Sequence, residues 1–179
     1  MSEQCPIIVD LDGTLVRDDT LYVLAWQMLI KKPHACLMLP IHLIKGKAAM
    51  KHYMSGVLEL DPSRLRFHED LIAWLKQQRA LGRRVVLCTA SSQQVADIIA
   101  QHIDLFDDVI GSDAYANLSG ERKAALLVDR YGWQGFDYCG NADVDLSVWK
   151  DANAAIVVNA KKGLAKQASN LCPVVQEFS

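Results

Sequence analysis

A short apolar run, residues 7–9, leads directly into Asp10-Leu11-Asp12-Gly13-Thr14 near the start of the chain. The run predicts a strand buried in a parallel sheet, so both carboxylates fall at its carboxyl end, where open α/β sheets bind ligands. Gly13 lets the chain turn sharply, and Thr14 adds a hydroxyl. With a cation to screen their repulsion, one carboxylate can attack an electrophile while the other transfers a proton. A surface turn can carry the same five letters, so the interpretation depends on downstream elements.

Short β-like segments recur along the chain and alternate with helical ones. Strands are expected at residues 7–10, 84–88, 136–139 and 155–158, with a very short fifth at Val109-Ile110. Most are almost continuously apolar, as strands buried on both faces of a parallel sheet are. The alternation predicts an α/β fold built on a doubly wound parallel sheet flanked by helices.

Capping residues mark the expected helices. Asp61-Pro62 is a good N-cap and first-turn pair for a helix that Gly82 ends. Ser91 or Ser92 can cap the next helix, and another is expected over residues 121–131. The residues of this last helix predicted to face inward are Ala125, Leu126 and Val128.

The segment from Thr20 to Leu60 carries no strand signal and interrupts the alternation directly after the first strand. It predicts a helical insertion that stands over the carboxylates as a cap. Residues 21–30 contain a single polar side chain, Gln27, and residues 35–44 are almost as apolar. Each run is shorter than the roughly 20 apolar residues that cross a bilayer. A helix that is apolar on all sides must nevertheless cover more than one face.

Three interpretations of this apolar cap stay open. It is the core of a small helical cap, an interface with a partner or second copy, or a surface that docks on a membrane or lipid-like substrate. The third would place four lysines near lipid head groups, namely Lys31, Lys32, Lys45 and Lys47. Four residues of the cap are candidates to face the substrate, namely Arg17, His34, His42 and His52. The alternative is that each is an ordinary surface or cap-core residue.

Composition and charge narrow the function classes. The 179 residues are 51% hydrophobic and 22% charged, which suits one domain with an insertion. A formal charge of −2 gives no electrostatic footprint for nucleic acid, so no such partner is expected. Five scattered cysteines without CxxC spacing favour neither a disulfide framework nor a zinc site. The N-terminal residues lack the pattern of a secretory signal, so we expect a cytoplasmic protein, with membrane association left open.

Three downstream elements add polar groups to the same predicted sheet edge. The strand at 84–88 leads into Thr89-Ala90-Ser91, where a hydroxyl and helix amides favour an anion. Lys123 lies near the start of a helix, where the helix dipole disfavours a positive charge, and a functional role would explain this placement. Residues 140–145 deliver an amide and two carboxylates, whose oxygens suit Mg²⁺. Taken singly, these elements are also explained as a helix cap, a solvated lysine and an acidic loop.

The order and spacing of the four elements resemble the haloacid dehalogenase superfamily, and the resemblance covers essentially the whole chain. It implies a Rossmann-like core over residues 1–16 and 62–179, with a small helical cap over residues 17–61 inserted after the first strand. It also implies Mg²⁺-dependent phosphoryl transfer through an aspartyl-phosphate.

The resemblance also assigns roles by position. Asp10 is the implied nucleophile, and Asp12 is implied to protonate the leaving oxygen and then activate the hydrolytic water. Thr89 and Lys123 are implied to hold the phosphoryl oxygens. The expected phosphate-binding set is Gly13, Thr89, Ala90 and Lys123.

The expected metal ligands include one departure from the superfamily pattern. They are the side chains of Asp10, Asn141 and Asp145, together with the main-chain carbonyl of Asp12. The superfamily commonly has an aspartate where this chain has Asn141, and an amide oxygen brings one negative charge fewer. We therefore expect weaker Mg²⁺ binding, with Asp145 or Asp143 supplying a carboxylate directly or through water.

A second resemblance concerns Gly140-Asn141-Ala142 and the apolar cap. Both are similar to phosphatase-like domains fused to prenyltransferases of the ubiquinone-biosynthesis type, which implies a lipid-linked substrate or partner. No prenyltransferase is present in this chain.

The leading hypothesis is a Mg²⁺-dependent phosphomonoesterase that acts on a small or lipid-linked phosphate ester. Asp12 weighs against dehalogenation, because a halide leaving group needs no proton. A phosphotransferase would use the same residues. The alternative from another class is a non-catalytic or weakly active module that docks on a membrane or a prenyltransferase, which Asn141 and the apolar cap motivate. The sequence leaves the oligomeric state open.

Overall fold

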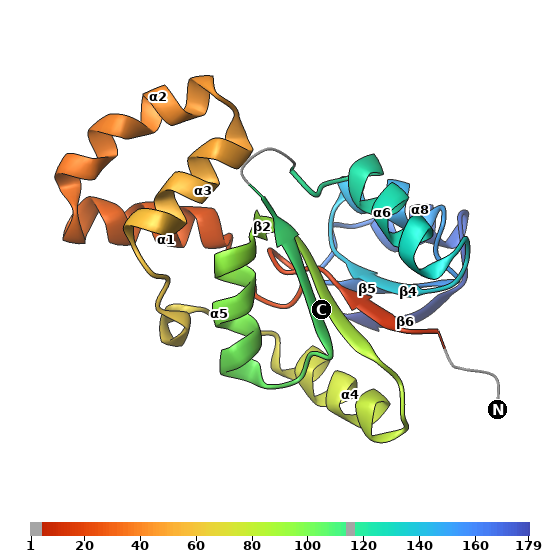
Figure 1. The fold of residues 1–179 in the computed structure, drawn as a ribbon. Coiled ribbons are helices and arrows are strands. Elements are labelled where there is room, and N and C mark those ends of the chain that lie inside the picture. The colour runs from red at the N-terminus through yellow and green to blue at the C-terminus, as the bar shows by residue number, and fades with distance from the viewer. Residues whose placement is uncertain (1–4, 114–116) are drawn as a thin grey trace.

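A six-stranded sheet forms the centre of the computed structural model, which describes residues 5–113 and 117–179 (Figure 1). The strand order is β3-β2-β1-β4-β5-β6, and every neighbouring pair is parallel. The strands are β1 Ile7–Val9, β2 Val85–Ser92, β3 Asp108–Ser112, β4 Asp137–Gly140, β5 Ala154–Val158 and β6 Val174–Phe178. The sheet grows outward from β1 in both directions, so the predicted doubly wound, Rossmann-like α/β fold is confirmed.

Helices connect the strands and cover both faces of the sheet. The α-helices are α1 Thr20–Lys31, α2 Leu39–Ile44, α3 Lys47–Val57, α4 Glu69–Ala80, α5 Gln93–Ile103, α6 Glu121–Tyr131, α7 Leu146–Trp149 and α8 Leu164–Ser169. Short 3₁₀ segments are η1 Pro33–Met38, η2 Pro62–Arg64 and η3 Asp143–Asp145. The core beside α4 and α5 contains Ile7 and Val9, whereas Ile8 joins the core beside α6, α7 and α8. Alternate residues of β1 therefore serve opposite faces.

The strand predictions hold within a few residues, and Val109-Ile110 lies inside β3. The edge strand β6 was not predicted from the sequence. Its residues alternate between half-buried and exposed and include Gln176 and Glu177, so they lack the continuous apolar run of an interior strand.

The helix predicted to begin at Asp61-Pro62 begins later. Asp61 caps only the 3₁₀ turn η2, and α4 starts at Glu69. Between them the chain runs beside the segment that leaves β1: Phe67 pairs with Val16 in an antiparallel bridge, and the amide of His68 donates to the carbonyl of Leu15 at 2.9 Å. This pairing holds the two connections to the cap together and delays the helix.

The inward face predicted for α6 is wrong by one position. The buried residues are Lys123, Ala124 and Leu127, whereas Ala125 is exposed and Leu126 half-buried. The apolar pattern of residues 124–128 fits several helical faces, and the burial of Lys123 selects among them. At α5 the cap is Ser92, whose hydroxyl accepts from the amide of Val95 at 3.4 Å.

The segment between β1 and β2 is helical, as predicted, and α1, α2 and α3 form a lobe beyond the carboxyl end of β2 (Figure 1). Its boundaries at residues 17 and 61 stay a prediction. Within residues 5–113 and 117–179, no helix has the length and apolar character needed to cross a bilayer.

The corrected face of α6 yields a stability prediction. We expect Leu127→Ala to lower the free energy of unfolding by about 2–5 kcal/mol, because it opens a cavity in a buried core. Leu126→Ala, one residue earlier on the half-buried flank, should cost less than about 1.5 kcal/mol. Urea unfolding monitored by circular dichroism measures both, and a larger loss from Leu126→Ala would contradict the observed face.

Candidate active site

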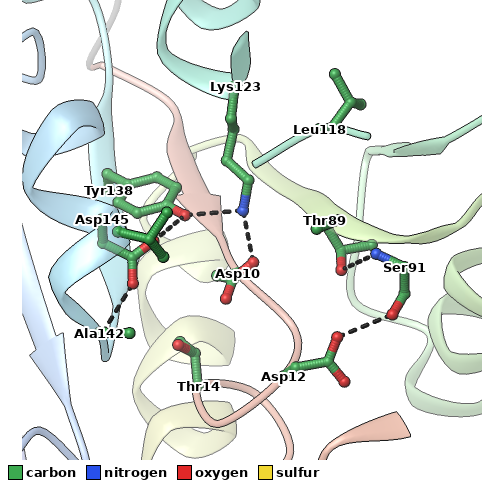
Figure 2. A network of polar contacts seen from close by, with 12 residues as sticks. Asp10, Asp12, Thr14, Thr89, Ser91, Leu118, Lys123, Tyr138, Ala142 and Asp145 are labelled. Atoms are coloured by element: carbon green, nitrogen blue, oxygen red, sulfur yellow. Dashed lines mark hydrogen bonds and ion pairs between the residues drawn. The ribbon is translucent and has the colours of Figure 1, made fainter. Parts of the chain in front are cut away.

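Asp10 and Lys123 form a charged pair at the carboxyl end of β1. The Asp10 amide donates to the carbonyl of Cys139 on β4 at 3.1 Å, which fixes the strand end beside its neighbour. From the first turn of α6, the Lys123 ammonium reaches the Asp10 carboxylate, with 2.6 Å between Nζ and Oδ1 (Figure 2). The other oxygen, Oδ2 of Asp10, makes no hydrogen bond to another described residue. One oxygen of this carboxylate therefore stays available.

A buried chain of hydrogen bonds holds Lys123 in place. Its ammonium donates to the Tyr138 hydroxyl at 2.9 Å, and that hydroxyl donates to Oδ1 of Asp145 at 2.9 Å. The other Asp145 oxygen accepts from the amides of Asn141 at 2.9 Å and Ala142 at 3.0 Å. Both oxygens of Asp145 are thus engaged within the protein, and the side chain orients Tyr138 and the loop after β4.

Burial and the neighbouring charges shift the acidity of these groups. Burial raises the pKa of Asp10 to about 6, although the Lys123 ammonium opposes the shift. Burial alone would lower the pKa of Lys123, but Asp10, Cys88 and Asp145 raise it, and the net direction is upward. Burial, together with Asp145, raises the pKa of the Tyr138 hydroxyl, which stays neutral and able to donate. Lys123 therefore remains an ammonium.

Asp12 is held between the cap and the end of β2. Its Oδ1 accepts from the amide of Thr20, the first residue of α1, at 2.7 Å. Its Oδ2 accepts from the Ser91 hydroxyl at 2.8 Å, and the hydroxyls of Ser91 and Thr20 lie 2.9 Å apart. The carboxylate thus sits at the positive end of a helix dipole, in a site that fixes its orientation.

Thr89 lies on β2 beside the end of β1, and Figure 2 shows it on the same side of the site as Ser91. Its hydroxyl oxygen accepts from the Ser91 amide at 3.0 Å. The hydroxyl hydrogen remains free to donate to an anion. The side chain is completely buried, so its position is fixed by packing.

Gly13 allows the loop after β4 to approach the loop after β1. Its φ of +78° favours glycine, and a Cβ atom there would lie 2.2 Å from Nδ2 of Asn141. The Thr14 hydroxyl donates to Oδ1 of Asn141 at 3.3 Å. Gly13 therefore brings the amide side chain of Asn141 to the same strand ends as Asp10.

A pocket of about 260 Å³ connects Asp10, Asp12, Lys123, Asn141 and Asp145, whereas Thr89 and Gly13 are not among its lining residues. Its lining includes Ala90, Gly120 and the cap residue Lys51, whose ammonium donates to the Ala90 carbonyl at 2.8 Å. Burial lowers the pKa of Lys51. Four carboxylates and two ammonium groups line the pocket, namely those of Asp10, Asp12, Asp19, Asp145, Lys51 and Lys123.

The donor set fits a hard cation such as Mg²⁺. Asp10 offers a carboxylate oxygen, Asn141 offers its amide oxygen, and Asp12 can add its main-chain carbonyl. Among the described residues there is no cluster of three or more His, Cys, Asp or Glu side chains suited to a metal. A site here would therefore combine one carboxylate with neutral oxygens and water.

Some predicted residues lie elsewhere, and others were missed. Asp143 is exposed and pairs with Lys161. The pocket lining contains none of Arg17, His34, His42 and His52. The residues that contact the site without having been predicted there are Tyr138, Thr20, Ser91 and Lys51. Ser91 directly follows the predicted residue Ala90, and Lys51 lies in the basic cap segment.

Comparison with known proteins places the chain in a family. A family model of haloacid dehalogenase-like hydrolases matches residues 7–148, which include every strand end of this site. The chain belongs to this family. The chain is also 33% identical over 153 residues to the uncharacterized protein y4nM of Sinorhizobium fredii (strain NBRC 101917 / NGR234). The match covers 86% of this chain but only 30% of the length of that curated relative.

Solved phosphatases of the same fold are also similar. A substrate-bound phosphoserine phosphatase complex superposes with a TM-score of 0.65 at 16% identity, covering 97% of this chain and 94% of that one. A phospho-aspartyl intermediate analogue of phosphoserine phosphatase gives a TM-score of 0.63 at 15% identity, covering 99% and 94%. At these identities the likeness shows the fold alone, and the assignment to the haloacid dehalogenase-like hydrolases rests on the family model.

The buried hydroxyl of Tyr138 yields a prediction. Tyr138→Phe should lower the free energy of unfolding by about 1–3 kcal/mol, because Lys123 and Asp145 each lose a buried partner. The control is Tyr131→Phe, which removes a buried hydroxyl that has no partner among the described residues and should be nearly neutral. Equal effects in urea unfolding would show that the Lys123–Tyr138–Asp145 chain contributes nothing.

Proposed function

We propose that this protein is a Mg²⁺-dependent phosphomonoester hydrolase that acts through an aspartyl-phosphate on Asp10. The observation that carries the proposal is the Lys123 ammonium 2.6 Å from one oxygen of a carboxylate whose other oxygen has no described partner. An ammonium in that position can neutralise a phosphoryl oxygen while the free carboxylate oxygen attacks phosphorus.

The charge of the pocket supports the requirement for a cation. Even with Asp12 protonated, the three other carboxylates against two ammonium groups leave an excess of negative charge where a phosphate ester must bind. Mg²⁺ bound by Asp10, Asn141 and the Asp12 carbonyl would neutralise that excess and polarise a phosphoryl oxygen. The uncapped N-terminus of α6, at Gly120, adds main-chain amides to the same side of the pocket.

In the first half-reaction, an oxygen of Asp10 forms a bond to phosphorus, and the bond from phosphorus to the ester oxygen breaks. Asp12, protonated at this stage, gives its proton to the departing oxygen, so the alcohol leaves neutral. The contacts of Asp12 with Thr20 and Ser91 hold it in one orientation for this transfer. Thr89 and Lys123 hold the phosphoryl oxygens.

In the second half-reaction, Asp12 is a carboxylate and removes a proton from water. The water oxygen bonds to phosphorus, the bond from Asp10 to phosphorus breaks, and inorganic phosphate leaves. Asp12 regains its proton and Asp10 its free carboxylate, so the cycle closes. An alcohol in place of water would make the same residues a phosphotransferase.

The substrate we propose is a small or lipid-linked phosphate ester, hydrolysed in the cytoplasm. A pocket of about 260 Å³ holds a phosphoryl group with a short organic part, so a longer chain would have to extend beyond it. A panel of esters that includes isoprenyl phosphates tests the link to prenyltransferase substrates implied by the sequence.

The nucleophile is tested by Asp10→Asn. We expect hydrolysis of an aryl phosphate in the presence of Mg²⁺ to fall at least about 1,000-fold, because an amide cannot form the phospho-enzyme. The control Asp143→Asn removes one exposed carboxylate outside the pocket and should retain activity. Retained turnover in Asp10→Asn would exclude this mechanism, and inactivity of the parent protein on every ester would favour a non-catalytic module.

The metal site is tested by Asn141→Asp. The added negative charge should tighten Mg²⁺ binding by about tenfold, seen as a lower Mg²⁺ concentration at half-maximal activity and in calorimetry. Asn170→Asp, an exposed change on the far end of α8, is the control. If the two variants bind Mg²⁺ alike, Asn141 lies outside the coordination sphere.

A further inference from the structure

The outer side of α1 is an apolar stripe exposed to solvent. Tyr22, Trp26, Leu29 and Ile30 follow the spacing i, i+4, i+7 and i+8, so they share one face of the helix. Tyr22 is 74% exposed and Trp26 64%. The buried residues of α1 include Leu24 and Met28, which pack in the core. The helix is therefore apolar on two faces, of which the protein covers one.

The next two segments extend this exposed apolar surface. Leu37 at 78% and Ile44 at 87% are among the most exposed large apolar residues of the protein, and α2 has no buried residue at all. Figure 1 shows α1 and α2 as arms of the cap lobe, joined by the 3₁₀ segment. We name as the cap surface Tyr22, Trp26, Leu29, Ile30, Leu37, Met38, Ile41, Leu43 and Ile44. It holds nine of the 14 exposed large apolar residues in the described part of the chain.

The charged residues between positions 20 and 58 have one sign, and the nearest carboxylates in the sequence are those of Asp19 and Glu59. Residues 20–58 contain five lysines and three histidines but no aspartate or glutamate. Lys31, Lys45 and Lys47 are exposed, and none forms a salt bridge with a described residue. An apolar surface flanked by unpaired cations, with a tryptophan and a tyrosine, is the composition of helices that lie in the interface of an anionic bilayer.

We propose that the cap surface docks this protein on the surface of an anionic lipid bilayer. The apolar side chains of α1 and α2 would enter the boundary between head groups and acyl chains, while Lys31, Lys45 and Lys47 contact anionic head groups. The proposal goes beyond the hydrolase activity and does not depend on it, since no residue of the cap surface lines the catalytic pocket.

Charge favours a lipid surface over a second copy of the chain. A symmetric dimer through the cap surface would bring the same basic segments together. Residues 20–58 offer no carboxylate to pair with them, so the contact would concentrate like charge. Anionic head groups supply the missing negative charge.

Vesicle co-sedimentation tests the proposal, with phosphatidylcholine vesicles and vesicles that also contain phosphatidylglycerol. We expect binding to the anionic vesicles to be at least about tenfold tighter and to weaken as salt rises. The triple variant Trp26→Glu, Leu37→Glu and Ile44→Glu should lose this binding. Its control places glutamate at exposed apolar sites outside the cap, Leu81 and Trp133.

The charge contribution has its own pair of variants. Lys31→Glu, Lys45→Glu and Lys47→Glu together should weaken binding to anionic vesicles at least about tenfold. The control makes the same change at three exposed lysines outside the cap, namely Lys76, Lys150 and Lys166, and should weaken vesicle binding much less. Equal weakening by the two sets would mean that net charge alone acts, which would overturn the assignment to the cap.

Two further outcomes would also overturn docking on lipid. One is parent protein that binds neither kind of vesicle. The other is a parent protein that elutes as a dimer in size exclusion and binds no vesicles, together with an apolar triple variant that elutes as a monomer. That result would make the cap surface a self-association surface. Hydrolysis of a soluble aryl phosphate, measured on the same samples, reports separately on the catalytic proposal, and the cap variants should retain it.

Discussion

The burial of an ammonium and a carboxylate together at the end of β1 is the constraint that organises this protein. Lys123 and Asp10 would each be costly to bury alone, and they are tolerated because they pair and because the Tyr138 hydroxyl accepts a second hydrogen bond from the ammonium. The pair also fixes the rotation of α6. With Lys123 directed at the strand end, Leu127 one turn later must face the core. The same interaction thus sets a helix face and positions the carboxylate of the proposed nucleophile.

Much of the fold follows from patterns that are local in sequence. Strands buried on both faces must be apolar throughout, so β1 and β5 are visible as runs, and their positions relative to the helices dictate a parallel sheet. Elements whose limits are set by distant partners are not visible in this way. The edge strand β6 lacks the signal because one side of it faces solvent, and the start of α4 depends on the bridge between Val16 and Phe67, 51 positions apart.

The residues of the candidate site also fall into those with a local sequence signal and those whose role depends on distant partners. Asp10, Asp12, Thr89 and Lys123 could be predicted as candidates because each follows a strand or opens a helix, and the sheet brings those ends together. Their supporting residues gave no comparable signal. Tyr138 reads as one more apolar strand residue, and its hydroxyl acquires a role only when Lys123 and Asp145 meet it in space. The orientation of the cap residue Lys51 depends on how α3 packs against β2, whose Ala90 lies 39 positions later in the sequence, and no local pattern reveals that packing.

Helix α1 connects the proposed active site and the cap surface in one rigid element. Its first amide, at Thr20, holds the carboxylate of Asp12, while Tyr22 and Trp26 begin the exposed stripe within the next two turns. A helix cannot tilt on a lipid surface at one end and leave its N-terminus unmoved, so docking of the stripe and the orientation of Asp12 share a mechanical link. A phosphate ester that stabilises one position of α1 would change the affinity of the cap for the bilayer. Because coupling between two binding events is reciprocal, the bilayer would change the affinity of the protein for the ester by the same factor. Such coupling would place Asp12, the proposed proton-transfer group, under the influence of the lipid surface, whereas Asp10, the proposed nucleophile, is held by the sheet.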